Sequence, residues 1–190
     1  MAHAAAPEVR GGIVSRRALV LGAVVGGVSG LQVASAQTAV DAFQPVTGAA
    51  KFAFTLPDVA GESVALAGQR GQVVLVHFFA TWCEPCRDEL AALRALVARA
   101  AGRATVVAIS VAEVSRRVRG FLEQNPVNYP VLLDEDRAVS KAWGVSVLPT
   151  TFVLDAELRP RFVVERDLAW DQINPDHLLA IAKIGLIPGG

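Results

Sequence analysis

The chain has 190 residues, of which 53% are hydrophobic and 19% charged, so it is long enough for one domain with a sizeable core. Its formal net charge is zero, so nothing in the charge favours nucleic acid or an anionic surface as a partner. It has only two cysteines, which excludes a small scaffold held together by several disulfides.

The first 36 residues have the pattern of an export signal. Arg16 and Arg17 precede a weakly hydrophobic, Gly-rich run that extends from Ala18 to about residue 31. The sequence Ala34-Ser35-Ala36 then provides an A-x-A cleavage site. The paired arginines are similar to those of twin-arginine signals. An uncleaved membrane anchor is the alternative, but the run is short for a span of about 20 apolar residues.

The composition divides the chain into three segments. We expect residues 1–36 to be the twin-arginine-like export signal, residues 37–50 to be a flexible lead-in without periodicity, and residues 51–187 to be one folded domain. The signal predicts a periplasmic or otherwise extracytoplasmic location, with a membrane anchor if it is not cleaved.

The folded segment is expected to open with a short antiparallel hairpin. Residues 52–56 alternate in side-chain character, a turn cluster covers residues 57–62, and residues 63–66 form the returning strand. A loop from Gly68 to Gly71 then leads into the centre of the domain.

A strand, a pair of cysteines and a helix follow one another in the middle of the chain. Residues 73–79 are apolar or aromatic except for His77, which predicts a strand buried on both faces. Cys83 and Cys86 come next, and a stripe of apolar residues predicts a helix over about residues 83–101. The N-terminus of a helix offers free N–H groups and a partial positive charge, which favour a thiolate at Cys83.

The remaining elements complete an α/β domain without a repeat or a second domain. Residues 105–110 are β-branched and apolar, so with the preceding strand and helix they form a right-handed βαβ unit with parallel strands. After this unit, the sequence predicts a helix over residues 114–125, a strand at 131–133 and a helical turn at 139–143. It then predicts a strand at 151–154, its hairpin partner at 161–165 and a last helix that begins at Asn174.

The Cys-x-x-Cys spacing predicts a redox-active dithiol in which Cys83 is the nucleophile. A structural zinc site is one alternative, but it needs about four ligands, and the chain has no second cysteine pair and no His cluster. A purely structural disulfide is another, but a bridge between Cys83 and Cys86 closes too short a loop to stabilise the fold much. We therefore expect neither a metal nor a cofactor at this site.

Two motifs and the order of the elements resemble the thioredoxin fold. The motifs are Trp82-Cys83-Glu84-Pro85-Cys86 and Leu148-Pro149-Thr150-Thr151-Phe152. More narrowly, the hairpin, Thr81 before the first motif, and an insertion over residues 127–143 resemble the exported TlpA/ResA-like thiol-disulfide oxidoreductases. The likeness covers about residues 50–185. It implies an α/β thioredoxin fold, with a central mixed sheet flanked by helices, an N-terminal β-hairpin and a central insertion.

The resemblance also implies which residues meet the substrate. It implies a cis Leu148–Pro149 peptide bond, with Pro149 packed against the dithiol and the backbone of Leu148 free to pair with an extended segment. The expected substrate-binding residues are Trp82, Glu84, Pro85, Leu148, Pro149 and Thr150. The exposed charge of Glu84 modestly opposes a thiolate at Cys83, which favours a reductase over an oxidant.

His77 and Glu113 are the two titratable candidates near the dithiol. His77 lies six positions before Cys83, where thioredoxins carry a buried acid, so its imidazole is a candidate to accept or relay the proton of Cys86. The alternative is a core histidine that bonds to the backbone. Glu113 matches a glutamate that related proteins place beside the dithiol, where a partly buried carboxylate would hold the Cys86 proton. The alternative is a glutamate that interacts with a helix dipole.

We therefore predict an exported disulfide reductase. Cys83 attacks a protein disulfide, and Cys86 resolves the mixed disulfide and closes the Cys83–Cys86 bridge. The resemblance implies re-reduction by a membrane thiol-disulfide electron donor. It also implies two classes of substrate, the haem-binding cysteines of apocytochrome c and the copper-site cysteines of oxidase assembly proteins.

Two other functions stay open from the sequence. A disulfide-forming oxidant or isomerase differs mainly in its reduction potential. A copper metallochaperone would use both cysteines as soft ligands, although no Met-rich stretch or neighbouring His supplies a third ligand. A peroxidase of the same fold needs a lone peroxidatic cysteine, which this sequence lacks.

Overall fold

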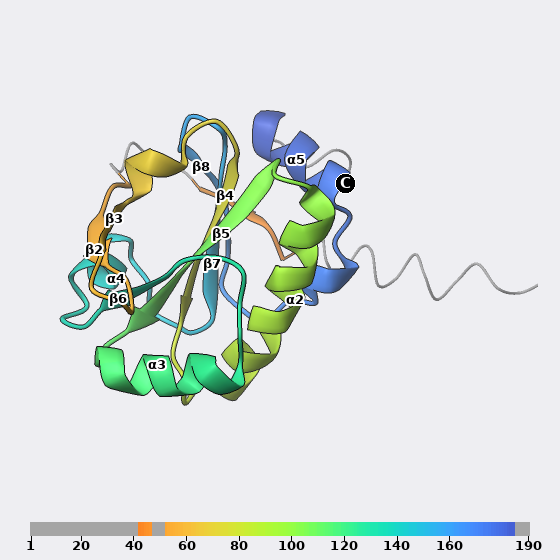
Figure 1. The fold of residues 1–190 in the computed structure, drawn as a ribbon. Coiled ribbons are helices and arrows are strands. Elements are labelled where there is room, and N and C mark those ends of the chain that lie inside the picture. Colours follow the sequence, from red (N-terminus) through yellow and green to blue (C-terminus); the bar gives the residue numbers. More distant parts are fainter. Residues whose placement is uncertain (1–41, 47–51, 185–190) are drawn as a thin grey trace, which may run out of the picture.

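The structure is a computed structural model that describes residues 42–46 and 52–184. Its centre is a six-stranded sheet with the strand order β1-β8-β7-β4-β5-β6 (Figure 1). The central strand β4 runs parallel to β5 and antiparallel to β7, so the sheet is mixed, as predicted. The strands of this sheet are β1 (Gln44–Pro45), β4 (Val73–Phe79), β5 (Ala104–Val111), β6 (Val131–Asp134), β7 (Thr150–Leu154) and β8 (Pro160–Val164).

Helices and a separate hairpin flank the sheet. In Figure 1, α2 and α5 lie on one side of the sheet, and the hairpin and α4 lie on the other. The hairpin pairs β2 (Thr55–Pro57) with β3 (Ser63–Ala65). The helices are α2 (Glu84–Ala100), α3 (Ser115–Gln124), α4 (Ala138–Ala142) and α5 (Pro175–Ile184), with 3-10 turns η1 (Leu66–Gln69) and η2 (Trp170–Gln172). The predicted α/β architecture with an N-terminal hairpin is confirmed.

Alternate residues of β4 face two separate cores. Leu75 and Phe79 pack into the core beneath α2 and α5, whereas the even-numbered residues from 74 to 78 pack into the core beneath the hairpin and α4. All seven residues of β4 are buried, which explains their nearly continuous apolar character. His77 shares the parity of Leu75 and Phe79, so its side chain points into the core beneath α2.

The first strand of the sheet lies in the segment that we expected to be a flexible lead-in. Phe43 is buried there, and the two residues after it pair with β8. The ring of Phe43 packs edge-on against Phe162 and Trp170, with centroid distances of 6.1 and 5.9 Å. A strand of two residues is too short to show a period in the sequence, so its pairing was not predicted.

Two helices differ in detail from the prediction. The helix after the cysteines ends at Ala100, because Ala101 adopts a left-handed conformation with a φ of 51°. In α5, Leu178 is buried as expected, but Ile184 is 53% exposed instead of buried. Six residues after Leu178, a helix with 3.6 residues per turn has turned Ile184 away from the buried stripe.

The central insertion forms β6 and α4 at the edge of the sheet. Asp134, at the end of β6, is wholly buried, and its carboxylate accepts hydrogen bonds from the N–H groups of Val139 at 3.0 Å and Ser140 at 2.7 Å. These bonds cap α4 and fix the turn between the strand and the helix.

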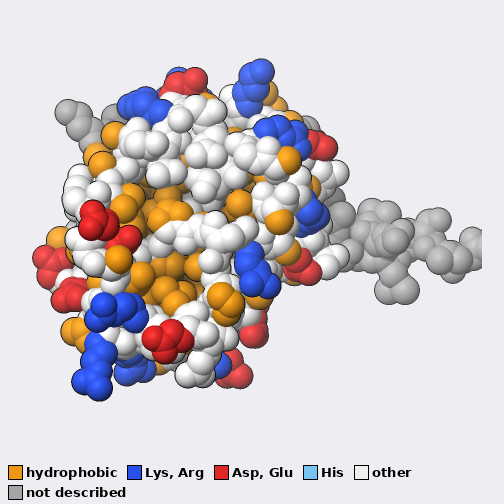
Figure 2. Space-filling model, viewed as in Figure 1, with side chains coloured by type: hydrophobic (Ala, Val, Ile, Leu, Met, Phe, Trp, Pro, Cys, Tyr) orange, Lys and Arg blue, Asp and Glu red, His pale blue; other side chains and the backbone are white. Residues whose placement is uncertain are grey.

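The hairpin and α3 leave a hollow between them, which faces the viewer in Figure 2 and is lined by hydrophobic side chains. Its volume is about 330 Å³, and Val59, Leu122, Val127 and Tyr129 are among the residues that line it. The predicted export signal, residues 1–36, lies outside the described residues. Among the helices of the described ranges, none is long and apolar enough to cross a membrane.

Candidate active site

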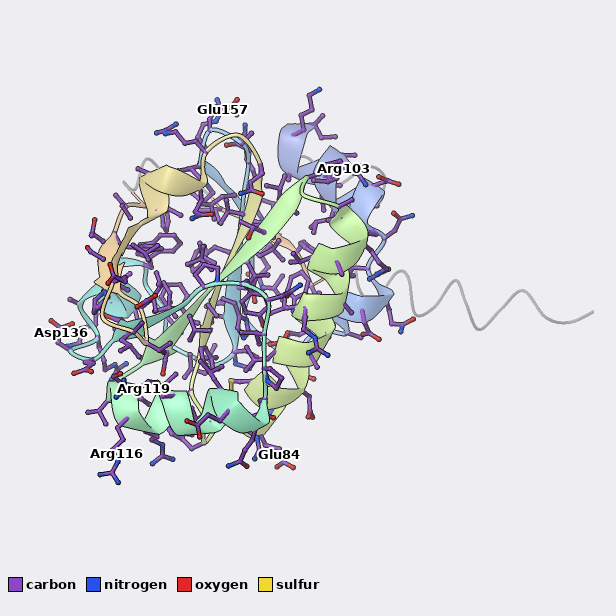
Figure 3. The ribbon with its side chains drawn as sticks, in the orientation of Figure 1. Glu84, Arg103, Arg116, Arg119, Asp136 and Glu157 are labelled. Carbon is purple, nitrogen blue, oxygen red and sulfur yellow. A yellow bond between two sulfur atoms is a disulfide. The ribbon has the colours of Figure 1, made fainter. Side chains whose placement is uncertain are left out.

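The two cysteines lie at the N-terminus of α2. Cys83 is the residue that caps the helix, Cys86 is in its first turn, and a disulfide joins them across a Cα–Cα distance of 5.3 Å. Glu84 lies between them and marks this end of α2 in Figure 3. Cys83 is 6% exposed and Cys86 is not exposed at all, so an incoming protein reaches the pair through Cys83.

A groove opens beside this pair. Trp82 is 66% exposed and lines a cavity of about 280 Å³ together with Val147 and Leu148. The Leu148–Pro149 peptide bond is cis, as the resemblance implied. Pro149 and Thr150 are buried, and the Thr150 hydroxyl donates a hydrogen bond to the Val147 carbonyl at 2.7 Å. The substrate-binding role predicted for Thr150 stays a prediction.

Glu84 and Pro85, the two residues between the cysteines, are exposed. Pro85 lies in the first turn of α2, where its missing N–H breaks no helical hydrogen bond. Glu84 is the first residue of the helix, so its carboxylate lies near the positive end of the helix dipole. Both side chains are therefore open to a docking protein.

Glu113 holds the loop that precedes the cysteines. Its carboxylate is buried at the end of β5 and accepts hydrogen bonds from the Thr81 N–H at 2.7 Å, the Thr81 hydroxyl at 2.5 Å and the Ser110 hydroxyl at 2.8 Å. Nε of Arg117 lies 2.9 Å from the same carboxylate. Because Thr81 is two residues before Cys83, Glu113 fixes the approach of the loop to the dithiol. The proton-holding role predicted for Glu113 stays a prediction.

His77 is completely buried. Its Nδ1 lies 3.0 Å from the Thr151 hydroxyl, and its Nε2 has no hydrogen-bond partner among the described residues. Burial disfavours the charged imidazolium and lowers the pKa of His77 to about 3. The imidazole is therefore neutral at neutral pH. Its proton-relay role is untested, but its side chain does face the core beneath α2.

Glu89 is a buried acid that the sequence reasoning missed. It is 2% exposed, and its Oε1 accepts hydrogen bonds from the Leu168 N–H at 2.8 Å and the indole N–H of Trp170 at 2.6 Å. Burial raises the pKa of Glu89 to about 8, and the bonds from Leu168 and Trp170 counteract that rise in part. One signal was available: Glu89 interrupts the apolar stripe of α2, three residues after Cys86 on the same face.

Glu89 and His77 form a buried pair in the core beneath α2. Oε2 of Glu89 has no hydrogen-bond partner among the described residues and lies 4.0 Å from Nδ1 of His77. Burial drives both groups toward their neutral forms, so near neutral pH the glutamate carries the proton and the imidazole is uncharged. Glu89 can therefore give or take a proton one helical turn from Cys86.

Within the described residues, no three or more His, Cys, Asp or Glu side chains are grouped so that they could hold a metal ion.

The fold and the position of the dithiol place this chain among the thioredoxin-like proteins. Residues 47–161 match the AhpC/TSA family, and the chain belongs to that family. The thiol-disulfide oxidoreductase ResA of Bacillus subtilis (strain 168) is 37% identical over 105 residues, which cover 55% of this chain and 59% of that protein. ResA of Geobacillus thermodenitrificans (strain NG80-2) is 30% identical over 130 residues, which cover 67% and 74%.

A solved structure agrees with these relatives. The putative thiol:disulfide interchange protein DsbE of Chlorobium tepidum matches with a TM-score of 0.65 and 25% identity, over 73% of this chain and 99% of that one. The resemblance to ResA-like oxidoreductases and the thioredoxin fold are thereby confirmed. The matched region spans about three fifths of the length of the Bacillus subtilis relative.

Proposed function

We propose that the protein is an extracytoplasmic thiol-disulfide oxidoreductase that reduces disulfides in other proteins. The observation that carries this proposal is the unequal exposure of the two cysteines at the N-terminus of α2: Cys83 reaches the surface and Cys86 does not. A nucleophilic thiol must be reachable, whereas the thiol that resolves the mixed disulfide works best when it is shielded from other proteins. The relatives named as thiol-disulfide oxidoreductases support the same class of enzyme.

The reaction follows from this geometry. The Cys83 thiolate attacks one sulfur of the substrate disulfide and forms a mixed disulfide, while the other substrate sulfur leaves as a thiolate and takes up a proton. Cys86 then loses its proton and attacks the sulfur of Cys83, which releases the second substrate thiolate and closes the bridge. Two electrons pass from the dithiol to the substrate.

Glu89 is the group that we assign to the proton of Cys86. Its pKa of about 8 lets it hold or give up a proton near neutral pH, and it lies three residues after Cys86 on α2. We assign the relay of that proton to His77, whose Nδ1 lies 4.0 Å from Oε2 of Glu89. Trp82, Leu148 and the exposed pair between the cysteines form the docking surface.

The reductive direction is supported by Glu84. A dithiol becomes a strong oxidant when its reduced form is stabilised, chiefly as a thiolate at the helix N-terminus. The exposed carboxylate of Glu84 lies beside that thiolate and modestly opposes it. Re-reduction then requires an electron donor, which the resemblance implies to be a membrane thiol-disulfide protein.

The location and the substrates are proposed from the sequence. The signal-like pattern over residues 1–36 supports an extracytoplasmic site of action. The resemblance to ResA-like proteins supports the cysteine pairs of apocytochrome c or of copper-site proteins as substrates.

The reduction potential of the Cys83–Cys86 pair tests the direction. We expect a value near or below about −230 mV when the protein is equilibrated against defined thiol and disulfide buffers, because values in that range belong to reductants. A value near about −120 mV would make the protein an oxidant and overturn the proposal. The Cys86→Ser variant, which has no redox pair, is the control for signals from other groups.

A further inference from the structure

The groove beside Trp82 combines apolar walls with a single charged side chain. It lies between the turn after β5, the loop before β7 and the start of α4. Trp82, Val145, Val147 and Leu148 supply apolar walls, and Trp82 and Val147 are 66% and 44% exposed. Arg137 is the charged residue that lines the groove.

The guanidinium of Arg137 has no acidic partner among the described residues. The three residues directly before Arg137 are acidic, but their carboxylates accept hydrogen bonds from backbone N–H groups. Asp134 accepts from Val139 and Ser140, Glu135 accepts from Ser115 at 3.3 Å, and Asp136 accepts from Ala138 at 2.9 Å.

The backbone of Arg137 is nevertheless fixed. Its N–H donates a hydrogen bond to the Asp134 carbonyl at 3.2 Å, and its carbonyl accepts from the Lys141 N–H at 3.0 Å and the Ser140 hydroxyl at 3.2 Å. The residue adopts a left-handed conformation with a φ of 63° at the N-terminus of α4. The fold therefore fixes the backbone of Arg137 beside a largely apolar groove, and its exposed guanidinium makes no ion pair among the described residues.

We propose that this groove selects substrate segments that have an apolar side chain beside the reactive cysteine and an Asp or Glu next to it. The apolar side chain packs against Trp82 and Val147, and the carboxylate pairs with the guanidinium of Arg137, whose fork of N–H groups suits a carboxylate. The inference rests on the proposed function, because it names the substrate class of the same site. The partner is thus a protein with acidic residues around its cysteine pair.

The preference can be measured with three peptides that differ at one position. Each peptide has an intramolecular disulfide between two cysteines, an apolar residue beside the first cysteine, and Glu, Gln or Lys at the adjacent position. We expect the second-order rate constant for reduction by the full chain, reduced beforehand at Cys83 and Cys86, to be about tenfold higher for the Glu peptide than for the Gln peptide, and lowest for the Lys peptide. Added salt should reduce this ratio, because a partly exposed ion pair is screened.

Three variants locate the effect. Arg137→Gln should bring the Glu-to-Gln ratio to about one, whereas Arg137→Lys, which keeps the charge but loses the fork, should keep part of it. Arg103→Gln changes the net charge equally, but Arg103 lies at the opposite end of the molecule from Glu84 in Figure 3, so this control should keep the full ratio. A ratio that survives in Arg137→Gln would overturn the role of Arg137.

The failures of the two proposals differ. If wild-type protein reduces the Gln peptide but treats the Glu peptide no better, the substrate preference is wrong and the reductase function stands. If it reduces none of the peptides, the proposed function fails, and the preference fails with it. If Arg137→Gln does not fold, the salt dependence of the wild-type ratio and the Arg137→Lys ratio still decide the question.

Discussion

At the scale of single residues, Glu89 and His77 are each held by burial in the form that carries no charge. They lie 4.0 Å apart in the core beneath α2, yet the two shifts have opposite consequences for stability. The pKa of Glu89 is raised from its ordinary value, so the folded protein holds a proton there that the unfolded chain releases as pH rises. The pKa of His77 is lowered by folding. As pH falls, His77 therefore becomes protonated in the unfolded chain but stays neutral in the folded protein.

Glu89 should therefore make the oxidised protein less stable as pH rises. The stabilisation that comes from the protonated Glu89 is fully present below about pH 4.5 and is lost as pH rises through about 8. Between pH 6.5 and 8.5 we therefore expect the free energy of unfolding to fall by about 2 kcal/mol. His77 is neutral in both states over most of that interval. Urea unfolding at the two pH values measures the change.

Glu89→Gln keeps an acceptor for Leu168 and Trp170 but does not titrate, so its stability should hardly change over this interval. Asp88→Asn removes an exposed neighbouring carboxylate and should keep the wild-type decline. An equal decline in wild type and Glu89→Gln would show that Glu89 is not the group responsible.

At the scale of elements, the first turn of α3 is tied to the loop that carries the cysteines. Arg117 of α3 reaches the buried carboxylate of Glu113 at 2.9 Å and the Thr81 hydroxyl at 3.0 Å. Its guanidinium thus compensates a charge that the end of β5 holds inside the protein. Arg116 is one residue earlier, projects outward in Figure 3, and makes no such contact.

Arg117→Ala should destabilise the protein by about 1–2 kcal/mol, because it leaves the carboxylate of Glu113 buried without its cation. The loss stays within this range because the Arg117 side chain is 58% exposed, so solvent screens its charge. Arg116→Ala, the matched removal of an exposed arginine from the same helix, should change stability by less than about 0.5 kcal/mol. Urea unfolding of both variants makes the comparison. Equal losses would mean that α3 is not tied to the loop through Glu113.

At the scale of the whole molecule, the folded unit begins before residue 51, where the sequence pattern predicted its start. Phe43 is 5% exposed and packs against Phe162 of β8 and Trp170 of η2. Trp170 in turn donates its indole N–H to Glu89. The edge strand before the hairpin therefore contributes to the core that also contains the buried acid.

Phe43→Ala should cost about 3–5 kcal/mol of unfolding free energy, as expected for removal of a buried aromatic ring. Gln44→Ala, a change at the exposed residue that follows Phe43, should change it by less than about 0.5 kcal/mol. The measurement is again urea unfolding. A loss as small as that of Gln44→Ala would mean that this segment does not belong to the folded unit.

The sequence by itself determined the fold class of this protein and the position of its dithiol. The apolar run of β4, the cysteines after it and the amphipathic α2 are contiguous, so local period and spacing were enough to predict a dithiol at a helix N-terminus in an α/β domain. The helix boundary near Gly102 and the hairpin had local signals of the same kind.

The tertiary structure decided which side chains surround that dithiol. His77 and Glu89 lie on consecutive elements and Trp170 lies 81 residues after Glu89, and no local pattern shows that the three meet in one core. Among the described residues Arg137 has no acidic partner, although three acids directly precede it and accept hydrogen bonds from backbone N–H groups. Burial and pairing depend on contacts between residues far apart in sequence, and these exist only once the chain has folded.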